Sequence, residues 1–166
     1  MRATCAAALS LSVALAVACG QPADSRFVET TPDRATFAPV SDLLEHRCGS
    51  LDCHGVVQRN LRVYGAAGLR LDPTAQPSSK QFTTDAEYDQ NYQSVIGLEP
   101  EAMTLVVSQK GDNPLRLSLL RKPLGVESHK GGTLIMKGDD QYTCIASWLA
   151  GNEDMLACAR AVDATP

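Results

Sequence analysis

Two cysteines and a histidine stand close together in the peptide CGSLDCHG, residues 48–55, and this peptide constrains the fold more than any other part of the chain. His54 directly follows Cys53, and four residues separate Cys53 from Cys48. Two thiols followed by an imidazole are typical of c-type haem attachment, in which each sulfur forms a thioether and the histidine ligates the iron. The usual spacing is two residues. The peptide between these cysteines is therefore expected to bulge, which its small residues permit.

The first 18 residues have the pattern of an export signal. A cationic start, Met1-Arg2, precedes an alanine-rich apolar run that is too short for a membrane span, and small residues come directly before Cys19. This pattern predicts lipoprotein processing, in which Cys19 becomes the new N-terminus and carries the lipid. Ordinary cleavage that releases a soluble protein stays open as an alternative, because alanine occupies position 16, where lipoprotein signals most often have leucine.

The cysteine count agrees with export. An exported chain folds in an oxidising compartment, where thiols are paired or otherwise consumed. Of the six cysteines, Cys5 leaves with the signal and Cys19 is used by the lipid. Residues 48–55, here called the attachment peptide, would use Cys48 and Cys53 for haem. Cys144 and Cys158 then remain, and they are predicted to form a disulfide.

The chain divides into three parts. Residues 1–18 are the predicted lipoprotein signal peptide, and residues 19–40 are rich in Pro, Thr, Ala and Asp without an apolar period, which predicts a flexible tether. Residues 41–166 have the length of one domain.

The domain is predicted to be mostly α-helical. Ser41 is a suitable N-cap for a short helix that delivers Cys48, and Thr84 with Glu87 forms a capping box at the start of another. Further helices are predicted after Asn113-Pro114 and over residues 140–150, the latter ending at Gly151. Residues 60–72 are expected to form short extended segments, and residues 103–108 either a strand or a buried helical turn.

Several short motifs follow the attachment peptide in a fixed order. They are Gly68 to Leu71 (GLRL), Ser118 to Pro123 (SLLRKP), His129 with Gly131 and Gly132, and a terminal helix with Tyr142 and Trp148 before Gly151. From Cys48 to Gly151 the chain resembles the planctomycete-type cytochrome c domains of exported bacterial proteins. The resemblance implies a small cytochrome c-like helical domain with long loops around one haem, and electron transfer in the cell envelope. Cys144 and Cys158 lie outside this pattern.

The attachment peptide assigns the proximal iron ligand to His54. The distal ligand is open between His129 and Met136, which lie on the same predicted loop, and a vacant or water-filled position is a third alternative. The resemblance favours His129, and the glycines beside it would let the backbone approach a ring edge. Met136 follows two apolar residues, which suits a buried thioether.

The leading functional interpretation is a membrane-tethered electron carrier rather than an enzyme. It would hold one covalent haem c on Cys48 and Cys53, exchange single electrons with redox proteins of the cell envelope, and contact the bilayer through Cys19. We expect an outer-membrane lipoprotein or a periplasmic protein. Nucleic acid is not an expected partner, because the chain has a net charge of −4 and neither a basic stripe nor an aromatic ladder.

Three other interpretations stay open. In the first, Cys48 and Cys53 form a small disulfide in a haem-free envelope lipoprotein that acts as a binding or scaffolding module. In the second, these cysteines bind zinc together with His46 and His54, although adjacent Cys53 and His54 would have difficulty sharing one tetrahedral ion with the other pair. The third is a peroxidase-like enzyme, which requires an open iron position and a distal acid-base group.

Overall fold

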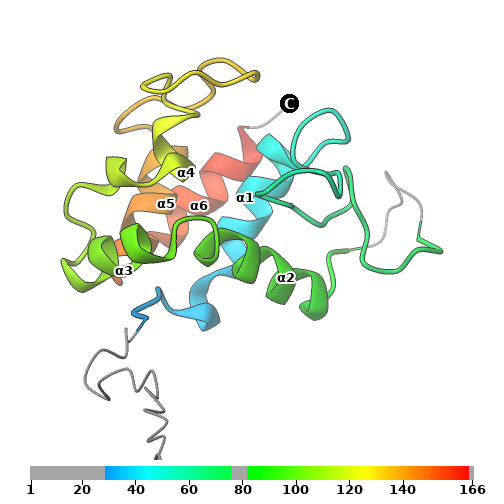
Figure 1. Cartoon of the computed structure of the whole chain (residues 1–166), viewed down its shortest axis with the longest axis horizontal. Coiled ribbons are helices and arrows are strands. Elements are labelled where there is room, and N and C mark those ends of the chain that lie inside the picture. The colour runs from blue at the N-terminus through cyan, green and yellow to red at the C-terminus, as the bar shows by residue number, and fades with distance from the viewer. Residues whose placement is uncertain (1–28, 76–81, 165–166) are drawn as a thin grey trace, which may run out of the picture.

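The computed structural model describes residues 29–75 and 82–164 (Figure 1). The predicted signal peptide, Cys19 and the first part of the tether lie outside the described residues. Within these ranges there are six α-helices and two short 3₁₀ turns: η1 (Arg34–Thr36), α1 (Ala38–Cys48), α2 (Asp85–Ile96), α3 (Pro100–Ser108), η2 (Pro114–Arg116), α4 (Ser118–Arg121), α5 (Asp140–Ala150) and α6 (Met155–Asp163). The prediction of a mostly α-helical domain is confirmed.

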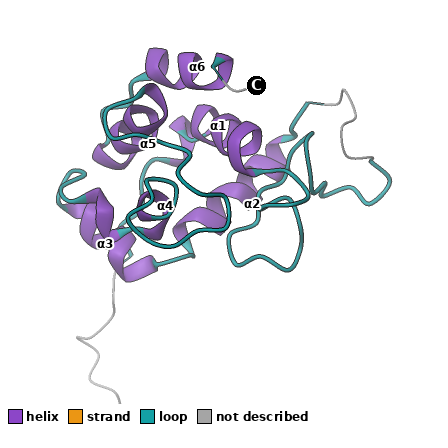
Figure 2. Cartoon of the chain, turned by 90° about the horizontal axis from the view of Figure 1, so that it is seen from above, coloured by secondary structure: helices purple, strands orange, loops and turns teal. Residues whose placement is uncertain are grey.

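Three helices, α1, α5 and α6, pack together. α5 and α6 pack against each other, and both contact α1 (Figure 2). The described residues 49–75 and 82–84, between α1 and α2, and residues 122–139, between α4 and α5, contain no helix or strand (Figure 1). None of the helices in the described ranges is long and apolar enough to cross a bilayer.

An aromatic cluster lies at the centre of the core. The ring of Phe37 is fully buried, with its centroid 5.4 Å from that of Tyr92 and 5.0 Å from that of Trp148. The indole Nε1 of Trp148 donates to the carbonyl of Asp33, and the hydroxyl of Tyr92 donates to that of Pro32. These contacts attach residues 32–37 firmly to the domain.

The first boundary of the domain therefore differs from the prediction. α1 begins at Ala38, with a proline in its first turn, and Ser41 is not its N-cap but a buried residue whose hydroxyl donates to Glu45. Residues 33–40 belong to the packed domain rather than to a tether, because Phe37 and Val40 are buried in the core. Phe37 and Val40 are two isolated apolar residues without helical or strand periodicity, so the sequence pattern did not indicate that they are buried.

The capping box predicted at the start of α2 and the predicted end of α5 at Gly151 are confirmed. Thr84 and Glu87 form the reciprocal capping box of α2, and the carboxylate of Asp139 accepts from the backbone of Tyr142 at the start of α5. Gly151 ends α5 with a left-handed φ of 72°. Residues 103–108, predicted as either strand or helix, lie in helix α3.

α6 was not predicted. Its buried face consists of the small residues Ala157, Cys158 and Ala161, which give a weak apolar signal. Asp154 caps its first turn by accepting from the backbone N–H of Ala157. The predicted disulfide between Cys144 and Cys158 is present and joins α6 to α5.

A buried ion pair holds the segment that follows the attachment peptide. Arg70 Nε lies 2.8 Å from Glu87 Oε1, and the two side chains are only 4% and 1% exposed. Glu87 also accepts from the backbone of Leu71. In place of the short extended segments expected over residues 60–72, the structure has loop and one isolated bridge between Tyr64 and Leu69. This loop is fixed by side chains of α2 rather than by pairing with a second strand.

Candidate functional site

The attachment peptide folds back on the end of α1. The backbone N–H of His54 donates to the carbonyl of Cys48 at 2.9 Å. Within the turn, the N–H groups of Cys53 and Gly55 both donate to the carbonyl of Ser50, at 3.0 and 2.9 Å. The four intervening residues therefore form a compact turn, which returns His54 to the neighbourhood of Cys48.

Three glycines let this turn close. A Cβ atom on Gly55 or on Gly68 would lie 2.0 Å from the carbonyl oxygen of Gly49, far inside van der Waals contact. The three backbones pack directly on one another, so only glycine fits at Gly55 and Gly68 without movement of the chain. This packing brings the GLRL segment against the attachment peptide.

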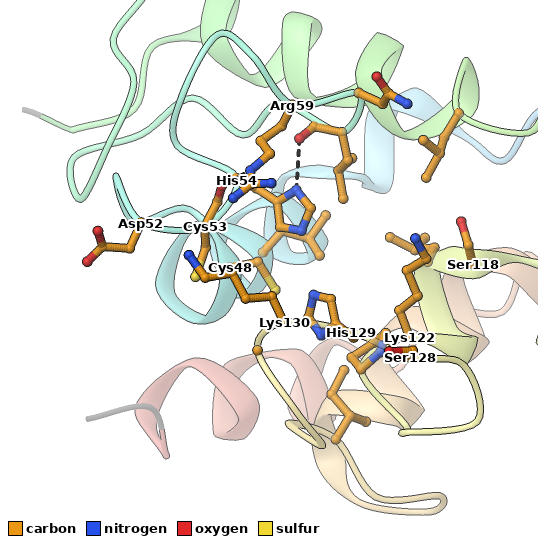
Figure 3. A pocket seen from close by; sticks show the side chains of 18 of the residues that line it. Cys48, Asp52, Cys53, His54, Arg59, Ser118, Lys122, Ser128, His129 and Lys130 are labelled. Atoms are coloured by element: carbon orange, nitrogen blue, oxygen red, sulfur yellow. Dashed lines mark hydrogen bonds between the residues drawn. The ribbon is translucent and has the colours of Figure 1, made fainter.

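A cavity of about 520 Å³ opens beside the attachment peptide (Figure 3). This volume is within the usual range for small-molecule and cofactor sites. The lining includes the apolar residues Leu44, Leu61, Leu98, Leu119, Pro123, Ile135 and Ile145. It also includes the polar and charged residues Asp52, Gln58, Arg59, Asn60, Ser118, Lys122, Ser128 and Lys130. The site therefore suits an amphipathic ligand.

His54 lies in this cavity with its tautomer fixed. Its Nδ1 is 2.9 Å from the carbonyl oxygen of Leu61, and because a carbonyl can only accept, Nδ1 carries the proton. Nε2 then has a free lone pair, which is the form that binds a metal. Burial, opposed by the Leu61 hydrogen bond, lowers the pKa of His54, and the charges of Arg59 and Lys122 act in the same direction as burial. The ring is therefore held neutral.

His129 faces His54 across the cavity. The two ring centroids are 6.2 Å apart and the ring planes are nearly parallel, 17° apart, and Figure 3 shows the two rings next to each other. His129 Nδ1 lies 3.3 Å from the carbonyl oxygen of Gly132, which directs Nε2 away from that carbonyl. Gly132 has a left-handed φ of 71°, and its N–H donates to the carbonyl of His129, closing the turn that presents the ring.

Both predicted attachment cysteines are free thiols that line the same cavity. Burial, with a contribution from neighbouring Cys53, raises the pKa of Cys48 to about 11. The Cys48 thiol is therefore protonated at neutral pH. The structure thus brings together Cys48, Cys53, His54 and His129, which the sequence singled out from two distant segments.

This donor set fits a porphyrin iron. Two imidazoles that line one cavity, with ring centroids 6.2 Å apart, could both ligate one metal bound there. Both free thiols line the same cavity, so they could form thioethers with a porphyrin bound there. The apolar wall suits the porphyrin face.

Two other residues that the sequence suggested as metal ligands, Met136 and His46, lie outside the cavity lining. Met136 is 71% exposed and His46 is exposed, and neither lines the cavity. In residues 29–75 and 82–164, no three His, Cys, Asp or Glu side chains gather as a metal cluster, so the zinc grouping with His46 is not assembled. Sequence reasoning missed the Leu61 carbonyl that orients His54, and gave no role to Lys122 although the SLLRKP motif contains it.

Comparisons of the chain with protein-family models, with curated proteins and with solved structures found no match.

Proposed function

We propose that this protein is a c-type cytochrome that transfers single electrons in the cell envelope. Cys48 and Cys53 would bind one haem through thioether bonds, and His54 and His129 would be the axial ligands of its iron. The observation that carries the proposal is the convergence of two free thiols and two facing imidazoles on one cavity. When bound, the haem would supply the one-electron chemistry.

The residues of the chain have separate tasks in this proposal. The Leu61 carbonyl orients His54, and the turn at Gly132 orients His129. The buried side chains of Leu44, Ile135 and Ile145 exclude water from the apolar part of the cavity. Because imidazoles would occupy both axial positions, we propose a carrier rather than an enzyme of the peroxidase type, which needs an open position.

The cellular setting rests on the sequence. The export signal and Cys19 support a lipoprotein of the outer membrane or a periplasmic protein, with redox proteins of the envelope as partners. The ordered motifs from Cys48 to Gly151 support a cytochrome c-like domain of the planctomycete type.

The absorption spectrum of the purified protein tests the proposal. The full chain is produced for export together with a haem c attachment system, and its spectrum is recorded in reducing alkaline pyridine. A haem c spectrum with about one haem per chain is expected. A chain without haem would overturn the proposal, and a Cys48–Cys53 disulfide in that material would support the haem-free scaffolding module instead.

A further inference from the structure

We infer that Lys122 binds a carboxylate of the haem at the side of the cavity that faces away from the attachment cysteines. This inference rests on the proposed function, because the carboxylates belong to the porphyrin. It assigns the orientation of the cofactor in its site and gives a role to a charged residue that neither iron ligation nor thioether attachment uses.

The charge of the cavity differs in sign from the charge of the chain. Three cations, Arg59, Lys122 and Lys130, line the cavity with a single carboxylate, that of Asp52. The whole chain has a net charge of −4. An excess of positive charge around a partly apolar cavity favours a ligand with an apolar body and anionic groups. Haem has this character, since its ring is apolar and its two propionates are anionic.

The cysteines determine which cation can reach the propionates. Thioethers form at the two vinyl positions of haem, and the propionates lie on the opposite edge of the ring. The carboxylates must therefore point to the side of the cavity remote from Cys48 and Cys53. Figure 3 shows Lys122 beside Ser118 on that side, whereas Lys130 reaches toward the two cysteines. Arg59 also lies on the cysteine side, where its Nε donates to the carbonyl of Cys53 at 2.9 Å.

Lys122 is available for this task. Its Nζ lies 3.5 Å from Glu127 Oε1, an ion pair with both side chains more than 40% exposed, so the attraction is weak. Glu127 does not depend on Lys122 for a partner, because Glu127 Oε2 accepts from Arg121 Nε at 3.0 Å. A carboxylate beside this ammonium would form a charge-assisted hydrogen bond at the rim.

The chain offers a matched pair of variants. Lys122→Gln and Lys130→Gln each remove one positive charge from the lining of the same cavity, so general electrostatic effects on the haem are similar. We expect the propionate bending bands in the resonance Raman spectrum of the haem-loaded full chain to shift in Lys122→Gln. We expect no shift in Lys130→Gln, and recovery of the original bands in Lys122→Arg. Unchanged bands in Lys122→Gln, or a shift in Lys130→Gln alone, would overturn the inference.

A second measurement serves if Lys122→Gln does not load haem. The crystal structure of the haem-loaded wild-type protein is expected to place one carboxylate oxygen within hydrogen-bond distance of Lys122 Nζ. Carboxylates directed to Lys130 or only to solvent would overturn the inference and leave the proposed function intact. A wild-type chain without haem would overturn both, and the pyridine spectrum distinguishes that outcome before any variant is made.

Discussion

His54 and His129 lie across one cavity with their ring centroids 6.2 Å apart, and each ring has its Nδ1 beside a backbone carbonyl. The His54 ring belongs to the predicted attachment peptide, residues 48–55, and the His129 ring comes from the loop before α5. Both rings are therefore held by backbone contacts at the same cavity, and they are the two residues that we propose as axial ligands.

Replacement of His129 is expected to change the iron coordination. The His129→Ala protein should lose the low-spin haem spectrum, because no second imidazole would face His54. Met136→Ala is the control, since the Met136 side chain is 71% exposed and outside the cavity lining. Absorption spectra of both oxidation states check this. Loss of the low-spin spectrum in only the methionine variant would show that Met136 is the distal ligand.

The substitution Gly55→Ala is expected to open the turn within residues 48–55. The new Cβ would lie 2.0 Å from the carbonyl oxygen of Gly49, so the backbone must move, at a cost of about 1–3 kcal/mol. We expect the fraction of chains with attached haem to fall, measured as haem per chain. Ser50→Ala is the control, because the exposed Ser50 contributes its backbone carbonyl to the turn. Equal haem content in both variants would contradict the packing described here.

Removal of the disulfide is expected to destabilise the domain. The Cys144→Ala/Cys158→Ala double variant loses a bridge with a sequence separation of 14 residues, and the chain-entropy model assigns about 3 kcal/mol to a loop of that size. Urea unfolding of both proteins measures the difference in the free energy of unfolding. Amide hydrogen exchange should rise first in α6, whose buried face consists of small residues. A double variant as stable as the wild type would show that helix packing alone holds α6.

The stability of the domain is expected to depend on pH through Glu45. This side chain is 7% exposed, and burial, partly opposed by hydrogen bonds from Thr83 and Ser41, raises its pKa from 4.5 to about 7. Between these pH values the folded state binds more protons at this site than the unfolded state. The free energy of unfolding should therefore fall as the pH rises from about 4.5 to 7, by up to about 3 kcal/mol.

Comparison with Glu45→Gln isolates this effect. The amide does not titrate, so the variant should lack the Glu45 contribution to the pH dependence while other groups keep theirs. The difference between the two unfolding free energies, measured by urea unfolding at several pH values, should change over the interval from about 4.5 to 7. A constant difference over that interval would show that Glu45 titrates at an ordinary pKa.

Local signals in the sequence predicted the elements that depend on local chemistry. The capping residues Thr84 and Asp139 and the terminating Gly151 each act within one turn of their own helix, so the ends of α2 and α5 could be read directly. α1 began earlier than predicted because Phe37 is recognised only through its contacts with Tyr92 and Trp148. Those contacts are tertiary and leave no pattern in the sequence.

In the candidate site, too, the sequence indicated the residues of one local motif but not the arrangement that depends on tertiary folding. The spacing of Cys48, Cys53 and His54 indicated one wall of the cavity from the sequence alone. The choice between His129 and Met136 could not be made there, since both stand on one loop and their directions depend on how that loop folds. In the structure, the turn at Gly132 directs His129 inward and Met136 is exposed.

The mass of the intact protein tests the central proposal most directly. The full chain is co-produced with a haem c attachment system, purified, reduced and extracted with acidified organic solvent to remove any haem that is not covalently bound. We predict a mass that exceeds that of the processed polypeptide, with its lipid where present, by one haem. A mass that is fully explained by polypeptide and lipid would contradict the proposal that Cys48 and Cys53 hold a haem.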